Sequence, residues 1–227
     1  MHAEFDNYAK HYSALLEDPL RDRFANSDFF CTRKLILIRE FFHRFGLDSE
    51  QSSWVDIGCG QGNLLRLGKA EFGLSTGCDV SPAMLRGCEG LRVLCQEQDD
   101  VLPFADGFAD FATAVCVYHH VPLSKRSALT REVARVLKPG GTFCIIEHNP
   151  VNPVTRMVVK RSPVDVDARL LGIRDTRRLL EEQHFRIAWE QYFLFLPEVL
   201  YRRIGIAESC LGRLPLGGQY AVFARAV

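Results

Sequence analysis

The sequence predicts an α/β fold in which helices cover both faces of a mostly parallel sheet. In the stretch Ser53–Asn63 a short apolar run (Trp54, Val55, Ile57) ends in glycines at 58, 60 and 62, and a helical pattern follows at once. A second strand-like run, 75–80, contains Asp79 near its end, and strand and helix patterns alternate up to residue 149. Such alternation is typical of doubly wound folds, in which a glycine turn presents backbone N–H groups to a ligand.

The size and composition of the chain are those of a globular α/β protein. Its 227 residues suffice for one such domain, and 47% hydrophobic with 25% charged residues is ordinary for this class. The formal net charge is +0, which disfavours proteins that hold nucleic acid through overall positive charge. We therefore expect no nucleic-acid partner.

The eight cysteines include no C-x-x-C pair. Cysteine-based zinc sites use such pairs, so we expect no metal site. Residues 1–10 are polar and charged rather than an apolar leader, and no apolar run is long enough to cross a bilayer. These features predict reduced cysteines in a cytoplasmic protein.

The N-terminal residues 1–50 predict two helices, near 5–16 and near 30–45, because aromatic and aliphatic residues recur there at helical spacing. Tyr8 and Tyr12 lie on the first of them. Either they line a ligand site, or they pack the helix onto the core.

The later elements follow from periodicity and from turn residues. Between residues 53 and 149 we expect a first strand at the apolar run 54–57 and further strands at 75–80, 92–96, 111–117 and 142–147. We also expect a helix ending near 72, a short helix after Ser81-Pro82, and a helix at 124–137 that Lys138–Gly141 ends. Beyond Pro150 we expect a proline-broken segment, a helix near 175–183, strands at 186–196 and 219–227, and an insert at 197–218.

The glycine turn differs from a dinucleotide fingerprint. G-x-G-x-x-G starting at Gly58 requires a third glycine at position 63, where Asn63 stands. Asp56 precedes the turn, and its carboxylate would repel a pyrophosphate and attract an ammonium group. Asp79 lies where such folds place an acid on ribose hydroxyls. The pattern favours a ligand with a ribose, a positive charge and no phosphate.

Four segments together carry a family resemblance. D-I-G-C-G-Q-G at Asp56–Gly62 with the later Asp79, L-P-F at 102–104, Y-H-H-V at 118–121 and L-K-P-G-G-T-F at 137–143 resemble the class I S-adenosylmethionine-dependent methyltransferases. The resemblance covers residues 52–147. It implies a Rossmann-like, mostly parallel seven-stranded sheet with an antiparallel last strand and an N-terminal helical lid.

The resemblance also implies how the chain is organised. We expect a single methyltransferase domain over 1–227, with residues 1–50 as the lid, 51–149 as the cofactor-binding core, and 150–227 as a substrate-side insert and the final strands. The oligomeric state does not follow from the sequence.

The expected cofactor is S-adenosylmethionine, with S-adenosylhomocysteine as its product. By resemblance, Asp56 and the glycine turn hold the methionine end, Asp79 the ribose, and an acid the adenine amino group. That acid is displaced by one residue from the usual family position, so either Asp99 or Asp100 takes this role. The remaining residues assigned to the cofactor site are Gly58, Cys59, Gly60, Gly62, Val80, Met84, Val101 and Cys116.

His119 and His120 are the candidate catalytic residues, because histidine titrates near neutral pH and both follow a strand at its carboxyl end. A base is needed for a hydroxyl acceptor and less for a neutral amine. Since successive residues off a strand point in different directions, we expect at most one of the two to face the methyl group. Glu147 and His148 rank second, and all four have an alternative structural role.

The leading hypothesis is therefore methyl transfer from S-adenosylmethionine to an oxygen or nitrogen atom of a small-molecule or glycan acceptor. One alternative is a cofactor-binding protein without catalysis that serves as a partner or regulator. Another is a nicotinamide-dependent oxidoreductase, which Asn63 and Asp56 disfavour. A protein or RNA acceptor is a variant of the leading hypothesis.

Overall fold

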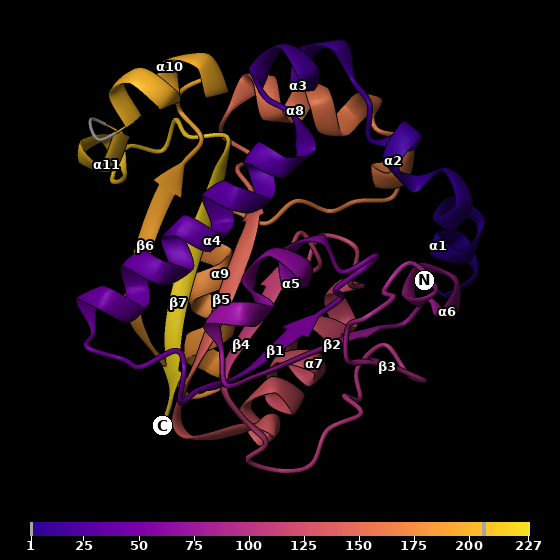
Figure 1. The fold of residues 1–227 in the computed structure, drawn as a ribbon, viewed down its shortest axis with the longest axis vertical. Coiled ribbons are helices and arrows are strands. Elements are labelled where there is room, and N and C mark those ends of the chain that lie inside the picture. The colour runs from indigo at the N-terminus through magenta and orange to yellow at the C-terminus, as the bar shows by residue number, and fades with distance from the viewer. Residues whose placement is uncertain (1, 206–207) are drawn as a thin grey trace.

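The computed structural model describes residues 2–205 and 208–227. Its centre is a seven-stranded sheet in the order β3-β2-β1-β4-β5-β7-β6 (Figure 1). The strands are β1 (Ser53–Ile57), β2 (Leu74–Asp79), β3 (Val93–Cys95), β4 (Ala109–Val115), β5 (Leu137–His148), β6 (Phe185–Phe193) and β7 (Gln219–Ala226). Strands β1 to β5 pair in parallel, and β7 pairs antiparallel with both β5 and β6. The predicted doubly wound sheet with an antiparallel last strand is confirmed.

Helices cover both faces of this sheet. The α-helices are α1 (His2–Tyr8), α2 (Tyr12–Leu15), α3 (Pro19–Phe24), α4 (Ser27–Arg44), α5 (Asn63–Gly68), α6 (Pro82–Leu85), α7 (Leu123–Val136), α8 (Pro153–Arg161), α9 (Ile173–Glu182), α10 (Glu198–Ile204) and α11 (Glu208–Leu211). Short 3-10 helices are η1 (Ala9–His11), η2 (Lys69–Glu71) and η3 (Pro163–Asp165). None of the described helices combines the length and the apolar character that crossing a bilayer requires.

The two faces of the sheet bury separate cores, because successive strand residues point to opposite sides. Phe111 of β4 packs with α4 and α5, whereas its neighbour Ala112 packs with α7 and α9. On the α4 side, Phe41 stacks on Phe223 of β7 with ring centroids 4.4 Å apart. The sheet is thus held between two helical layers, and its carboxyl edge is left to the N-terminal segment and α8.

The N-terminal segment differs from the prediction of two helices. The first expected helix is divided into α1, η1 and α2, and a further helix, α3, follows it. The Asp18 side chain caps α3 by accepting from the backbone N–H groups of Leu20 and Arg21. Asn26 caps α4 by accepting from Phe29 N at 2.8 Å, so α4 begins earlier than expected. Both caps supply acceptors for otherwise unpaired N–H groups at a helix start.

The predicted helix 124–137 ends within one residue of its expected end, at Val136, but Lys138–Gly141 belong to the next strand instead of preceding it. The strand β5 begins directly after α7, at Leu137, which pairs with Ala109 of β4. Gly140 has φ +76°, a conformation that glycine adopts without steric cost, and the register between β4 and β5 shifts here. The four residues form an irregular start of the strand.

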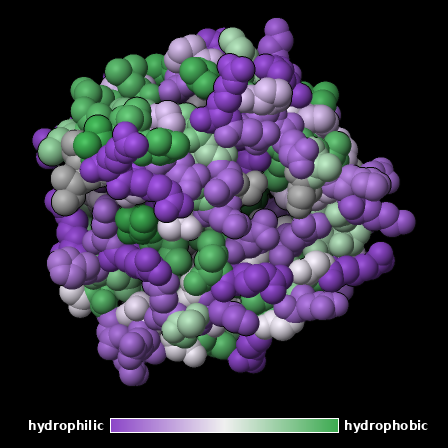
Figure 2. All heavy atoms as spheres, turned by 45° about the horizontal axis from the view of Figure 1, so that its top comes forward, coloured by the Kyte–Doolittle hydropathy of each residue, from purple (hydrophilic) through white to green (hydrophobic). Residues whose placement is uncertain are grey.

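The insert at 197–218 folds into α10 and α11 and exposes apolar side chains. Figure 2 shows them gathered on the upper left of that view. They are Val199, Leu200, Ile204, Leu214 and Leu216. Beneath them, Arg33 of α4 pairs with Glu208 of α11, and both side chains are buried.

Candidate functional site

A cavity of about 440 Å³ lies at the carboxyl edge of the sheet. The N-terminal segment, α4, the turns after β1 and β4, and the segment from α8 to η3 enclose it. This is the edge where open α/β sheets bind ligands. The predicted site residues that line it are Asp56, Gly58, Cys59, Gly60, Cys116, His119 and His120, together with Tyr12 and His148.

The glycine turn is shaped by positive φ angles at Gly58, Gly60 and Gly62, which are +65°, +55° and +74°. A Cβ on Gly58 would lie 2.5 Å from a methyl of Val117, so no larger residue fits without movement. Gly60 N donates to Asp79 Oδ2 at 2.8 Å, which ties the turn to the end of β2. The backbone of the turn therefore lies open to the cavity in a fixed conformation.

Asp56 and Lys34 give the cavity two buried charged groups of opposite kind. Asp56 accepts a hydrogen bond from Thr113 Oγ1 at 2.6 Å. Burial raises the pKa of Asp56 to about 7, and the bond from Thr113 opposes this only in part. Lys34 on α4 is 9% exposed, and among residues 2–205 and 208–227 its ammonium has no hydrogen bond or ion pair. The pair offers an anion for an amino group and a cation for a carboxylate.

This arrangement fits the methionine end of the expected cofactor, which carries one ammonium and one carboxylate. A buried acid with a raised pKa and a buried lysine without a partner are both costly until an opposite charge arrives. The fit rests on these two side chains together with the exposed backbone of the glycine turn.

The residues expected to hold the adenosine lie beside the cavity. Asp79 Oδ1 accepts from Ser81 N at 2.9 Å, so backbone N–H groups fix both carboxylate oxygens. Met84 is buried in α6. Helix α1 covers this region, and Asp6 Oδ1 lies 2.5 Å from Ser81 Oγ. Neither Asp79, Val80 nor Met84 lines the cavity itself.

Asp99 and Asp100 both face Lys125 of α7. The Lys125 ammonium is 3.1 Å from Asp99 and 3.8 Å from Asp100. Val101 next to them is exposed. None of the three lines the cavity, so the contacts do not distinguish Asp99 from Asp100.

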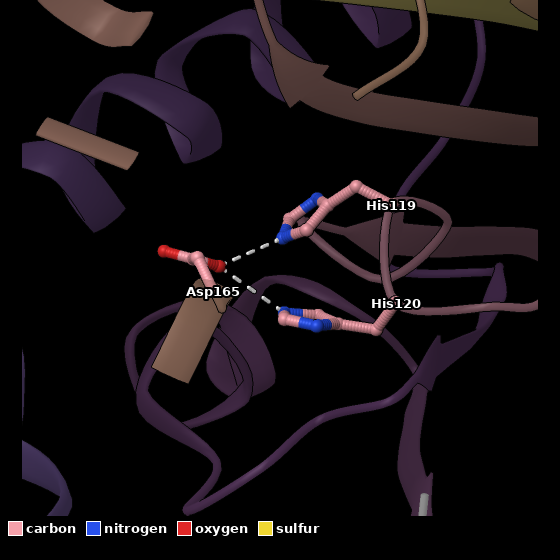
Figure 3. Close-up of side chains that lie close together, drawn as sticks. All are labelled: His119, His120 and Asp165. Carbon is pink, nitrogen blue, oxygen red and sulfur yellow. Dashed lines mark hydrogen bonds and ion pairs between the residues drawn. The ribbon is translucent and has the colours of Figure 1, made fainter. Parts of the chain in front are cut away.

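His119 and His120 converge on one carboxylate that the sequence analysis did not assign to the site. Figure 3 shows both imidazoles, on the turn after β4, pointing at Asp165 of η3. Asp165 Oδ1 is 3.2 Å from His119 Nε2 and 3.4 Å from His120 Nε2. The expectation that successive residues point apart is wrong here. Cys116 has φ +57° and ends the extended backbone, and His120 N then donates to Val117 O in a turn.

Glu147 at the end of β5 completes this cluster. Its carboxylate lies 2.5 Å from His119 Nδ1 and accepts a second bond from His119 N at 3.3 Å. Burial opposes the charged form of His119, but Glu147 and Asp165 outweigh it and raise its pKa well above the usual value. Burial likewise opposes a charged Glu147, yet the His119 cation lowers the pKa of that acid.

His120 and His148 behave differently from His119. Burial lowers the pKa of His120, although the bond to Asp165 acts in the opposite direction. Burial and the neighbouring His119 charge lower the pKa of His148 to about 4. The cavity therefore holds one charged and two neutral imidazoles at neutral pH.

Two residues at this site escaped the sequence analysis. Asp165 stands in a segment of mixed charge after Pro150, and only the fold brings it back to the histidines. A backbone bond from Arg169 N to His119 O, 2.8 Å long, holds that segment against the turn. Lys34 lies on α4 and gives no local signal beyond a basic residue on an otherwise apolar helix face.

Comparison with known proteins agrees with this geometry. A family model described as "Methyltransferase domain" matches residues 55–145. A tRNA (carboxymethyluridine(34)-5-O)-methyltransferase of Arabidopsis thaliana is 32% identical over 113 residues, which are 48% of this chain and 27% of that protein. A sterol 4-C-methyltransferase of Caenorhabditis elegans is 30% identical over 113 residues, 44% of this chain and 32% of that protein. The chain thus spans about a third or less of these relatives' lengths.

A solved structure shares the fold over the whole chain. It is a Thermotoga maritima S-adenosylmethionine-dependent methyltransferase, described as a possible histamine N-methyltransferase. The TM-score is 0.69 at 17% sequence identity, with 100% of both chains covered. At this identity the likeness concerns the fold.

Proposed function

We propose that this chain, which carries a class I S-adenosylmethionine-dependent methyltransferase domain, moves the cofactor's methyl group to an oxygen or nitrogen atom of a small-molecule or glycan acceptor. One observation carries the proposal. The glycine turn and the cluster of His119, His120 and Asp165 line a single cavity, so a cofactor and an acceptor can meet there.

The cofactor half of the proposal rests on complementary charges. Asp56 would hold the ammonium of the methionine end, Lys34 its carboxylate, and Asp79 the ribose hydroxyls. S-adenosylmethionine supplies a methyl group on a positively charged sulfur. The chain's own contribution is to bind and orient, and such alignment is worth about 7–11 kcal/mol in favourable cases.

The acceptor half rests on the histidine cluster. Transfer to a hydroxyl forms an oxygen–carbon bond, breaks the carbon–sulfur bond and releases the hydroxyl proton. His120 would accept that proton as the general base, because it lines the cavity and its lowered pKa keeps the imidazole neutral at pH 7. Glu147 and Asp165 would position His119 beside it.

An RNA acceptor is the second candidate, because relatives such as the Arabidopsis thaliana protein methylate tRNA by name. The formal net charge of +0 supports a small acceptor instead, since RNA binding relies strongly on phosphate neutralisation. A chain that only binds the cofactor would need no such cluster at the acceptor side of the cavity.

The experiment is a methyl-transfer assay with S-adenosylmethionine labelled in the methyl group. The purified chain is incubated with separate small-molecule, glycan and RNA fractions. We expect label in a small-molecule or glycan fraction, and a rate at least about 100-fold lower for His120→Ala. His43→Gln, an exposed histidine on α4, is the matched control and should not change the rate. Label in RNA alone, or in no fraction, would refute the proposal.

A further inference from the structure

The cluster of His119, His120 and Asp165 has the composition of a metal site. Two imidazole nitrogens and one carboxylate oxygen lie within 4.8 Å of one another. Metal–nitrogen and metal–oxygen bonds of about 2.1 Å place neighbouring ligand atoms about 3.0–3.5 Å apart. The two distances from Asp165 Oδ1 to the imidazoles, 3.2 and 3.4 Å, already fall in this range.

A second observation is the hydrogen bond between Glu147 and the ring nitrogen of His119 that does not face Asp165. Metal-binding histidines usually donate their other ring N–H to a carboxylate, which fixes the ring and leaves the first nitrogen for the metal. Glu147 takes this position at 2.5 Å from His119 Nδ1 and is fully buried. Its buried carboxylate holds Nε2 of His119 aimed at Asp165.

The surroundings leave room for further ligands. All three residues line the cavity, so an ion bound by them would keep positions open toward it. Two histidines and one carboxylate with open positions are typical of borderline divalent ions such as Zn²⁺, Fe²⁺ and Co²⁺, whereas Mg²⁺ prefers oxygen ligands. The expectation of no metal site rests on the absence of a C-x-x-C pair, but a site built from histidines and a carboxylate does not depend on cysteine spacing.

We propose that His119 Nε2, His120 Nε2 and Asp165 form a binding site for one divalent transition-metal ion, with Glu147 positioning His119. The ion deepens the function proposed above, on which its catalytic consequence rests. With the ion bound, His120 is a ligand and no longer the base, so an acceptor hydroxyl coordinated to the ion would lose its proton to water, at lower pH than a free hydroxyl. The resulting oxygen would attack the methyl carbon while the carbon–sulfur electron pair stays on sulfur. The acceptor class is then an oxygen-bearing compound able to bind a metal.

The test measures metal binding without cofactor or acceptor. The full chain is freed of metal with a chelator and titrated calorimetrically with Zn²⁺ and, in parallel, with Co²⁺ followed by visible absorption. We expect one equivalent to bind, with d–d bands and no thiolate charge-transfer band. Asp165→Asn and His120→Gln should weaken binding at least about 100-fold, and Glu147→Gln about 10–100-fold.

Matched controls are Asp167→Asn, an exposed acid two residues after Asp165, and His43→Gln. Both should keep the affinity of the unaltered chain, and circular dichroism must show each variant folded. Equal affinity in Asp165→Asn and the unaltered chain, a thiolate band, or no binding would overturn the site. If metal binds at the three residues and no methyl transfer is found, the site stands and the proposed function fails. If methyl transfer proceeds in the presence of chelator and no ion binds, the proposed function stands and the metal site fails.

Discussion

The ionisation of Asp56 should control cofactor binding around neutral pH. Its pKa is raised to about 7 by burial, so near pH 6 most molecules carry a neutral acid at the glycine turn. A neutral acid loses most of its attraction for the ammonium of the cofactor. We predict that the affinity for S-adenosylhomocysteine rises from pH 6 to pH 8, and that Asp56→Asn removes this dependence.

The magnitude follows from the pKa. When only the ionised form binds the ammonium, the dissociation constant at pH 6 is about ten times that at pH 8, or about 1.4 kcal/mol. The stability of the free protein changes in the opposite direction. The folded pKa of Asp56 lies above its unfolded value of 3.8, so its contribution to stability falls as pH rises from about 4 to 7.

Calorimetric titration with S-adenosylhomocysteine at pH 6, 7 and 8 measures this directly. Proton release at pH 6, obtained from buffers of different ionisation heat, provides a second readout. Thr113→Val removes the bond that lowers the pKa of Asp56 and should move the midpoint upward, whereas Thr113→Ser should not. A flat profile in the unaltered chain, or an equal slope in Asp56→Asn, would refute the reasoning.

Three further substitutions test the cavity and its support. Lys34→Met should weaken S-adenosylhomocysteine binding about tenfold without changing adenosine binding, if a carboxylate contact is worth about 1.4 kcal/mol. Arg33→Met should lower the free energy of unfolding by about 3–5 kcal/mol, because it leaves Glu208 as an unpaired buried charge. Gly58→Ala should weaken cofactor binding and cost at least about 1–2 kcal/mol of stability, since it adds left-handed strain and a clash with Val117. Calorimetry and denaturant unfolding measure these effects.

Each of these has a matched control. Lys69→Met removes an exposed lysine and should leave binding unchanged. Adding Glu208→Leu to Arg33→Met should restore much of the stability, and no recovery would mean that the charge is not the cause. Gly46→Ala meets φ +61° but no atom within 4 Å, so it isolates strain from clash. An equal loss in Gly46→Ala would contradict the clash with Val117.

The positions of the glycine turn and of Asp79 at the carboxyl edge of the sheet could be predicted from the sequence because their signals are local. The turn from Gly58 to Gly62 and the acid at Asp79 each follow a strand within a few residues, and spacing alone fixes their edge of the sheet. The structure brings them together through the bond from Gly60 N to Asp79. The alternation of strands and helices likewise predicted the mostly parallel sheet, and the family resemblance implied its antiparallel last strand.

The convergence of His119 and His120 on Asp165 could not be predicted in the same way. Asp165 reaches the histidines only after α8 has crossed the carboxyl edge, and no periodicity encodes that path. The direction of the His120 side chain depends on the left-handed backbone conformation of Cys116. Non-glycine residues adopt this conformation rarely, so the sequence does not predict it there. The cap at Asp18 starts the additional helix α3 and the cap at Asn26 starts α4 early, neither of which the aromatic spacing predicted.

The contacts of the N-terminal segment have a consequence for the rate of turnover. Phe5 lies edge-on to His120 with ring centroids 5.0 Å apart. Asp6 accepts a hydrogen bond from Ser81 Oγ, and Gln61 Nε2 donates one to Ala9 O. One short stretch of chain thus contacts His120, the start of α6 and the glycine turn together. We predict that release of the spent cofactor breaks all three contacts, because such opening steps set kcat in many enzymes. Turnover should therefore depend on solvent viscosity and begin with a burst of methylated product.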